Sequence, residues 1–85
     1  MPQSMFTEAY RVLVNTLIEA RKTAGINQTE LGRRLGKGQK YVSVIETGVR
    51  RVDLIEFVAI AKALKRDPVA LFTETLQRLP ETFDI

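Results

Sequence analysis

The stretch that decides the fold runs from Gln28 to Thr47 and reads QTELGRRLGKGQKYVSVIET. Its apolar residues recur at intervals of three and four, which is the spacing of one face of a helix, but glycines interrupt the pattern midway. We therefore expect two short helices, the first ending at Gly36 and the second beginning at Gly38. A three-residue turn opened by a glycine sets two such helices at a steep angle, so this stretch predicts a helix-turn-helix.

The same spacing predicts which residues are buried where the two helices cross. Four apolar residues are expected to meet there: Leu31, Leu35, Val42 and Ile45. Gly32 lies beside them, and we expect the crossing to exclude a side chain larger than alanine at this position. Alanine itself is expected to be tolerated or stabilising, because it forms helix more readily than glycine.

The chain on either side of this stretch is also predicted to be helical. An apolar stripe predicts a first helix of about five turns that ends at Gly25. Two acidic caps, at Asp53 and at Asp67 before a proline, predict the starts of a fourth and a fifth helix. The apolar stripes of these three helices are Phe6, Tyr10, Leu13, Leu17, Ala20 and Ala24, then Leu54, Phe57, Val58, Ala61 and Leu64, then Leu71, Phe72, Leu76 and Leu79.

The helix ends carry further signals. Asn27 with Glu30, and Asp53 with Glu56, each predict a capping box. Arg21 in the last turn of the first helix is expected to face the negative end of the helix dipole. With linkers of two to five residues and no strands, the sequence predicts an all-α fold: one five-helix domain over residues 1–79 and a short tail over residues 80–85.

Composition excludes several classes of protein. The 85 residues include no cysteine and no histidine, which excludes disulfides, thiolate metal sites and imidazole bases or ligands. The acidic residues fall at helix starts, where capping accounts for them, so we expect no enzymatic activity, no metal and no cofactor. No apolar run reaches the roughly 18 residues of a membrane span, and the N-terminus lacks a signal-peptide pattern. We expect a cytoplasmic protein with no membrane contact.

The net charge of +3 is unevenly distributed along the chain. Residues 33–51 hold six basic side chains against one acidic one, a balance of +5, whereas residues 67–85 hold one basic against four acidic, a balance of −3. A basic segment centred on the helix-turn-helix favours a polyanionic partner.

Two segments, GINQTELGRRLG (25–36) and YVSVIETG (41–48), resemble the helix-turn-helix of Cro and lambda-repressor type (XRE-like) regulators. The run RRVDLIEFVAIAKAL (50–64) resembles the fourth helix of that family, and Asp67-Pro68 the start of its fifth, so the resemblance covers about residues 10–72. Two positions depart from it: Lys37 replaces a residue that is usually apolar, and Gly38 a cap that is usually serine or threonine. We expect these departures to affect the rigidity and charge of the turn, and not the fold.

The resemblance implies a compact lambda-repressor-like domain that binds double-stranded DNA as a sequence-specific regulator, typically a repressor, and pairs as a homodimer on two half-sites. It implies that Gln28 holds a phosphate and steadies the first reading residue, and that Glu46 braces the recognition helix by pairing with an arginine. The reading positions of the family correspond to Gln39, Lys40, Ser43 and Val44.

Side-chain chemistry fits these roles. Gln39 can pair with adenine, Lys40 can donate to guanine, and Val44 can touch a thymine methyl, although Val44 is equally suited to a core or dimer contact. Arg50 is expected to neutralise phosphate, and the Tyr41 ring can instead pack beneath the helix. Arg33 and Arg34 are weaker candidates. The expected DNA-binding residues are Gln28, Lys37, Gln39, Lys40, Tyr41, Ser43, Val44, Thr47, Arg50 and Arg51.

The C-terminal part is expected to form the dimer contact, through Leu76, Leu79, Phe83 and Ile85, because its acidic charge would keep it away from DNA. Alternatively, these side chains form a satellite of the domain's own core. A second functional hypothesis is an antitoxin or docking module for a protein partner such as a toxin. The short segment after Phe72 disfavours it, since toxin-wrapping extensions are long.

Overall fold

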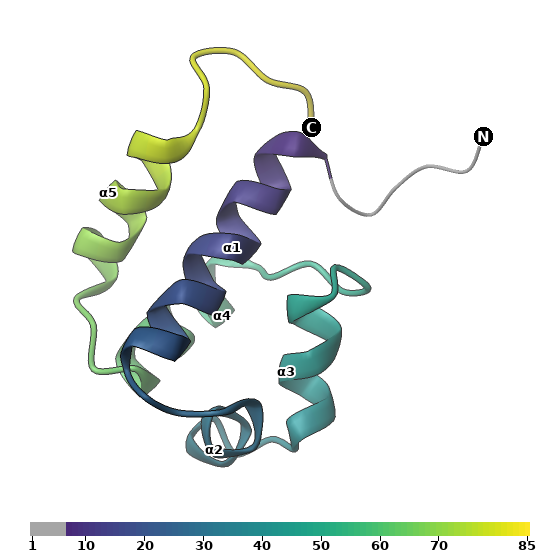
Figure 1. Ribbon diagram of the computed structural model, residues 1–85, viewed down its shortest axis with the longest axis vertical. Coiled ribbons are helices and arrows are strands. Elements are labelled where there is room, and N and C mark those ends of the chain that lie inside the picture. The colour runs from purple at the N-terminus through teal and green to yellow at the C-terminus, as the bar shows by residue number, and fades with distance from the viewer. Residues whose placement is uncertain (1–6) are drawn as a thin grey trace.

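The computed structural model describes residues 7–85, and Figure 1 shows the arrangement of their helices. The helices are α1 (Glu8–Thr23), α2 (Gln28–Arg34), α3 (Gln39–Glu46), α4 (Leu54–Ala63) and α5 (Pro68–Arg78). Within residues 7–85 there is no strand, so the predicted all-α class is confirmed. Phe6, the expected first member of the α1 stripe, lies outside the described residues, as do the other positions before residue 7.

A single core joins the helices. Helix α1 packs against α3 and against α5, α2 packs against α3 and α4, and α4 packs against α5 (Figure 1). The core cluster takes buried side chains from each helix: Leu17, Ala20, Leu31, Val42, Ile45, Phe57, Ile60, Ala61, Leu64 and Leu71. Because α1 is covered on two sides, it buries more than one stripe, including Val14 and Thr16, which the sequence pattern did not predict.

The stripes of α4 and α5 are confirmed in part, since Phe57, Ala61 and Leu71 are buried as expected. In α4, Ile60 is buried and Leu54 is 69% exposed, so the inclusion of Leu54 in the stripe was wrong. In α5, Thr75 is buried, whereas Phe72 and Leu76 are about half exposed. The Thr75 hydroxyl donates to the Leu71 carbonyl oxygen over 3.1 Å, which satisfies its polar group inside the core.

Most of the predicted helix ends are confirmed. Helices α1, α2 and α3 are each followed by a glycine with positive φ, for example Gly36 at +70°, and Asp53 with Glu56 forms both halves of a capping box. The Asn27 side chain accepts from the Glu30 amide over 2.9 Å, but the Glu30 carboxylate binds arginines of α2 instead of reaching back, so this capping box was wrong in its second half.

The connection between α3 and α4 spans residues 47–53, longer than the two to five residues expected. Hydrogen bonds hold it in place: the Arg50 amide donates to the Val44 carbonyl oxygen over 3.1 Å, and the Val52 amide donates to the Tyr10 hydroxyl over 2.9 Å. The extra residues extend a basic loop, which carries Arg50 and Arg51, beyond the end of α3.

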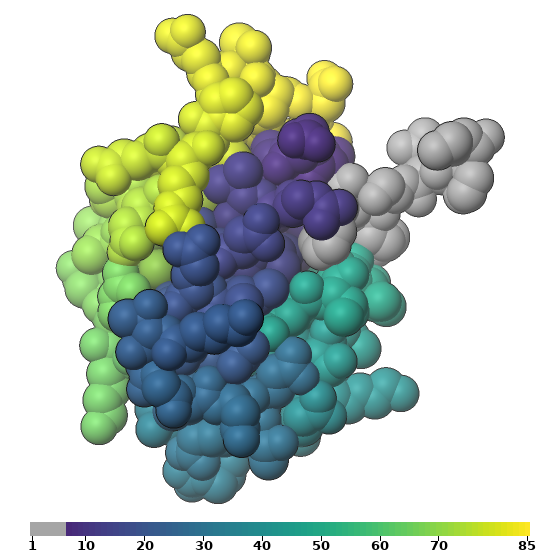
Figure 2. Space-filling model, in the orientation of Figure 1, coloured from purple at the N-terminus to yellow at the C-terminus, as the bar shows by residue number. Residues whose placement is uncertain are grey.

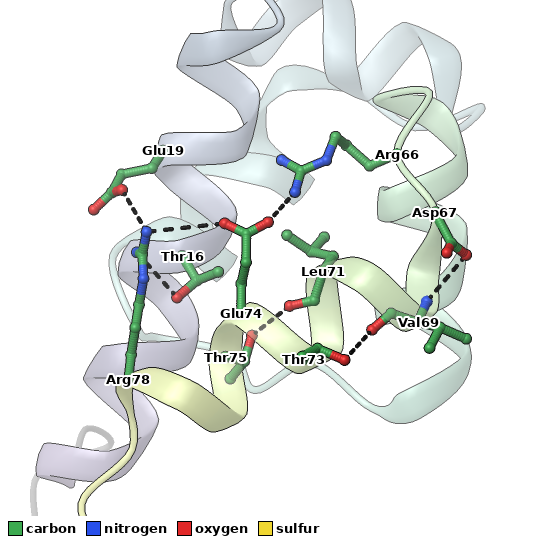
Figure 3. A network of polar contacts seen from close by, with 10 residues as sticks. All are labelled: Thr16, Glu19, Arg66, Asp67, Val69, Leu71, Thr73, Glu74, Thr75 and Arg78. Carbon is green, nitrogen blue, oxygen red and sulfur yellow. Dashed lines mark hydrogen bonds and ion pairs between the residues drawn. The ribbon is translucent and has the colours of Figure 1, made fainter.

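A polar network fixes α5 against α1 (Figure 3). Glu74 forms ion pairs with Arg66 and with Arg78, and Arg78 also pairs with Glu19 of α1 over 3.1 Å and donates to the Thr16 hydroxyl over 3.4 Å. None of the helices formed by residues 7–85 is both long and apolar enough to cross a membrane.

Candidate nucleic-acid interface

Helices α2 and α3 cross at a steep angle, as the sequence predicts; in Figure 1, α2 is seen nearly end-on while α3 runs up the page. The turn between them is closed by the Lys37 amide, which donates to the Gly32 carbonyl oxygen over 2.8 Å. A β-carbon on Gly32 would lie 2.6 Å from the carbonyl oxygen of Gly38. The expectation that alanine would be tolerated at position 32 is therefore wrong, because the neighbour is backbone and cannot rotate away.

The apolar residues of the crossing meet as expected. Leu31, Val42 and Ile45 are each 3% exposed, and Leu35 packs against them. Leu17 of α1 and Ile60 of α4 line the same small cavity as these four residues. This packing turns the polar side of α3 outward, so the orientation of the recognition surface follows from burial of its opposite side.

The outward side of α3 carries the expected reading residues. Gln39, Lys40 and Thr47 are exposed, and Ser43 and Val44 are half-buried. The Thr47 hydroxyl donates to the Ser43 carbonyl oxygen over 2.9 Å. Gly38 begins α3 without a side-chain capping bond, as expected for a glycine in that position.

A chain of polar contacts links the interior to the first residue of α3. Arg21 binds Glu46 through two hydrogen bonds, Nε to Oε2 over 2.7 Å and Nη2 to Oε1 over 3.0 Å, which confirms the predicted pairing of Glu46 with an arginine. Gln28 Nε2 donates to Glu46 Oε1 over 2.8 Å. Gln39 Nε2 in turn donates to Gln28 Oε1 over 2.6 Å. The structure thus joins the two glutamines that the sequence assigned to phosphate contact and base reading.

The Tyr41 hydroxyl is engaged within the protein. It donates to Glu56 Oε2 over 2.5 Å, and Arg50 Nη1 lies 2.7 Å from the same oxygen. Burial and this hydrogen bond raise the pKa of Tyr41 to about 12, while the Tyr41 hydrogen bond, with smaller contributions from the Asp53 amide and Arg50, lowers the pKa of Glu56. Tyr41 therefore joins α3 to the start of α4, and its ring packs against the core as one of the two expectations had it.

Three basic side chains lie close to tyrosine rings, two of them to the ring of Tyr41. Lys37 Nζ lies 5.6 Å and the Arg50 guanidinium 5.2 Å from the centre of the Tyr41 ring, and the Arg51 guanidinium lies 4.5 Å from the centre of the Tyr10 ring. Two of the three cations thus lie against a ring of α3, and the third lies against a ring of α1. Lys37 and Arg50 therefore lie beside α3, whereas Arg51 lies at the pocket that the C-terminal tail also lines.

Arg33 and Arg34, the weaker candidates, have partners of their own. Both bind Glu30, and the hydrogen bonds from Arg33 and Arg34 lower the pKa of Glu30 to about 2. Arg34 Nη1 also donates to the Ala63 carbonyl oxygen over 2.9 Å, where it binds the C-terminal end of α4. Arg34 therefore links α2 to α4.

Two residues important to this surface were missed in the sequence. Arg21 was assigned to the helix dipole, although its position one turn after Leu17 places it on the buried side of α1. A charge on a buried side requires a partner, and this is the signal that points to Glu46. Glu56 was assigned only to a cap, and its second role, as acceptor for Tyr41 and Arg50, depends on the path of the loop.

Three of the four expected dimer residues share a pocket with Arg51 and Val52 of the loop between α3 and α4. Leu79, Phe83 and Ile85 line a pocket of about 320 Å³, together with residues of α1 and the start of α4 such as Leu13. In Figures 1 and 2 the yellow tail lies beside the purple start of α1. Leu76 is outside this pocket and is 52% exposed. Within residues 7–85, no cluster of acidic side chains is suited to hold a metal ion.

Comparison with known proteins gives similarities over most of the chain. A family profile described as helix-turn-helix matches residues 17–71. An XRE-family like protein from Pseudomonas syringae pv. tomato str. DC3000 is similar with 42% identity and a TM-score of 0.78, covering 85% of this chain and 88% of that one. No curated protein gives a significant match.

Two more solved structures share the fold at lower identity. A mutant of the restriction-modification controller protein C.Esp1396I is 20% identical, with a TM-score of 0.75 over 81% of this chain and 92% of that one. The clp gene regulator ClgR from C. glutamicum is 18% identical, with a TM-score of 0.74 over 96% of this chain and all of that one. At these identities the likeness concerns the fold alone.

Proposed function

The chain belongs to the XRE-like helix-turn-helix family of DNA-binding transcriptional regulators, and we propose that it reads operator half-sites in the major groove with α3. The single observation that carries this proposal is the Gln39 side chain, exposed at the start of α3 and held from behind by Gln28. A reading side chain with a fixed amide has little rotational entropy to lose on binding.

The other exposed residues of α3 would complete the reading surface. Lys40 is suited to donate to guanine, Val44 to touch a thymine methyl, and Ser43 to bond either base edge. Around them, a ring of polar and basic side chains would bind phosphate and set the register: Gln28, Lys37, Tyr41, Thr47, Arg50 and Arg51. For Tyr41 this role requires that the hydroxyl move its single proton from Glu56 to the phosphate, because a phosphate oxygen can only accept a hydrogen bond.

We further propose that the protein acts as a homodimer and a repressor. One recognition helix covers too few base pairs to define a unique site, so two copies on adjacent half-sites are needed. Helix α5 supports such pairing, since Val69, Phe72 and Leu76 form an exposed apolar stripe on it at spacings of three and four. Occupying an operator that overlaps a promoter would block transcription, so repression would need no activity beyond DNA binding.

The proposal is tested by selection from a pool of DNA duplexes with a randomised central region. We expect the intact chain to enrich a two-fold symmetric site whose halves lie about one helical turn apart, roughly 10 base pairs from centre to centre. Enrichment of a single asymmetric half-site would contradict the dimer, and the absence of any enriched sequence would contradict sequence-specific reading.

A further inference from the structure

We propose that Glu56 and Tyr41 are positioning residues that hold the guanidinium of Arg50 in place to bind one DNA phosphate. Both would act through Arg50, and Tyr41 would do so in place of a phosphate contact of its own. The side chain of Glu56 is 17% exposed, whereas that of Arg50 is 45% exposed. This inference rests on the proposed function, in which Arg50 binds a phosphate.

The carboxylate of Glu56 is fixed by contacts other than the one with Arg50. Its Oε1 accepts from the Asp53 amide over 3.0 Å, as part of the capping box at the start of α4. Its Oε2 accepts from the Tyr41 hydroxyl over 2.5 Å. Because the backbone binds one oxygen and a half-buried side chain binds the other, the carboxylate is held in one orientation. Glu56 Oε2 therefore offers a cation a fixed point of contact.

Arg50 is held through both its backbone and its side chain. Its amide donates to the Val44 carbonyl oxygen of α3 over 3.1 Å. Its Nη1 lies 2.7 Å from Glu56 Oε2 and donates to the Arg51 carbonyl oxygen over 3.2 Å. The guanidinium also lies 5.2 Å from the centre of the Tyr41 ring. A side chain restrained in this way loses less conformational entropy when it binds a ligand.

These contacts leave one edge of the Arg50 guanidinium for a ligand. Nη1 makes the contacts with Glu56 and Arg51, and neither Nε nor Nη2 donates to an acceptor within residues 7–85. The Nε–H and Nη2–H groups of an arginine are parallel, so together they match two oxygens of a phosphate. The Tyr41 hydroxyl cannot bind the same phosphate as a donor, because it donates its single proton to Glu56. Arg50 is therefore the group arranged for phosphate at this point.

Charge alone and positioning predict opposite effects when the Glu56 carboxylate is replaced by an amide. Glu56→Gln removes a negative charge from a basic surface and releases Arg50 from its ion pair. If the carboxylate acts only through its charge, the variant should bind DNA more tightly than the parent. If the carboxylate positions Arg50, the variant should bind about three- to tenfold more weakly, because Nη1 loses the partner that holds it.

The experiment measures the affinity for the enriched duplex and for a scrambled duplex at one salt concentration, since a phosphate contact affects both alike. Glu56→Gln is made in the parent and in Arg50→Ala. In the parent it should weaken binding to both duplexes. In Arg50→Ala no guanidinium remains to be positioned, so Glu56→Gln should leave the affinity unchanged or raise it. A change that only disturbs the fold would weaken binding in both backgrounds.

Tyr41→Phe is the second variant, because it removes only the hydroxyl and keeps the ring against Arg50. It should weaken binding roughly threefold in the parent, through the lost hydrogen bond to Glu56, and should have no effect in Arg50→Ala. Glu74→Gln is the matched control, since it makes the same change in a carboxylate that pairs with arginines beside α1 (Figure 3), and it should bind as the parent does. Circular dichroism establishes which variants are folded, and if Glu56→Gln is unfolded, Tyr41→Phe decides.

The outcomes separate this inference from the proposed function. If Arg50→Ala binds as tightly as the parent, Arg50 contacts no phosphate, and the inference falls with that part of the proposed function. If Arg50→Ala binds more weakly while Glu56→Gln and Tyr41→Phe do not, the phosphate contact stands and the positioning role is overturned. A loss in either variant that persists in Arg50→Ala also overturns it. Losses confined to the parent background, with Glu74→Gln unchanged, support the inference.

Discussion

The backbone of Gly38 lies directly against Gly32, so closely that a β-carbon on Gly32 would be 2.6 Å from the Gly38 carbonyl oxygen and 2.8 Å from its carbonyl carbon. We expect Gly32→Ala to destabilise the protein by roughly 1–3 kcal/mol, because the overpacked helices must separate and this outweighs the better helix propensity of alanine. Chemical denaturation of parent and variant measures the difference. Equal or higher stability of Gly32→Ala would show that the helices separate without cost.

Gly38→Ser is the matched control on the other side of the same contact. A β-carbon on Gly38 meets no atom within 4 Å, and its φ of −93° suits any residue. Serine supplies the capping oxygen that α3 lacks, so stability should rise by roughly a few tenths of a kcal/mol. A loss comparable to that of Gly32→Ala would mean that any side chain in this turn is harmful.

These glycines illustrate how far the sequence predicts the fold. Periodicity placed Gly32 at the helix crossing, but it does not specify how closely two backbones approach, and the tolerance of alanine was therefore misjudged. Helix ends were predictable where glycine marks the left-handed residue, as at Gly36. The end of α4 was less so, because Lys65 adopts that conformation with φ of +59° and no glycine is present.

The residues of the candidate site were predictable from the sequence, but the contacts that orient them were not. Side-chain type and spacing identified Gln28 and Gln39, since both lie at helix starts within a specific motif. The contacts that orient them come from Arg21, on a helix outside the motif, and from a loop whose path depends on tertiary hydrogen bonds. The pattern along α1 signals that a buried Arg21 needs a partner, but it does not identify which residue of a distant helix supplies it.

Glu56 should make the stability of the folded protein depend on pH in the acidic range. Its pKa is lowered in the folded protein, chiefly by the Tyr41 hydroxyl, so its stabilising effect is present above the unfolded value near 4.5 and is lost as the pH falls through the folded value. We expect Glu56→Gln to cost roughly 1–3 kcal/mol at pH 7 and progressively less as the pH falls below about 4.5. Thermal melts of parent and variant across this pH range give the comparison.

Tyr41→Phe provides the paired test, because it removes the largest cause of the shift. The pKa of Glu56 should then move back toward its ordinary value, and the acid dependence attributable to Glu56 should shrink. A difference between parent and Glu56→Gln that stays constant from pH 7 to pH 3 would contradict the assignment.

Arg50 should contribute to affinity without contributing to sequence preference. If it neutralises one phosphate, Arg50→Ala should weaken binding to enriched and scrambled duplexes alike and reduce the slope of log K against log salt by about 0.9. Lys62→Ala is the control, since Lys62 is an exposed basic residue of α4 outside the proposed interface, and its slope should match the parent's. An unchanged slope for Arg50→Ala would remove Arg50 from the DNA contact.

Helix α5 should hold the dimer together. Leu76→Glu places a charge on its exposed apolar stripe, so the dimer should dissociate at concentrations where the parent remains paired. Analytical ultracentrifugation compares the two, with Ile55→Glu, a 76% exposed residue of α4, as the control for an added surface charge. If the parent is a monomer at every concentration, or if Leu76→Glu stays dimeric, the contact lies elsewhere.

The claim that α3 is the DNA-reading helix is tested most directly by mapping backbone amide shifts of the ¹⁵N-labelled protein as the enriched duplex is added. The largest changes should fall at Gln28, over residues 39–44 of α3, and at Arg50 and Arg51, where the proposed reading and phosphate contacts lie. Unchanged amides throughout α3, with the changes concentrated on α5, would contradict the assignment of α3 to the major groove.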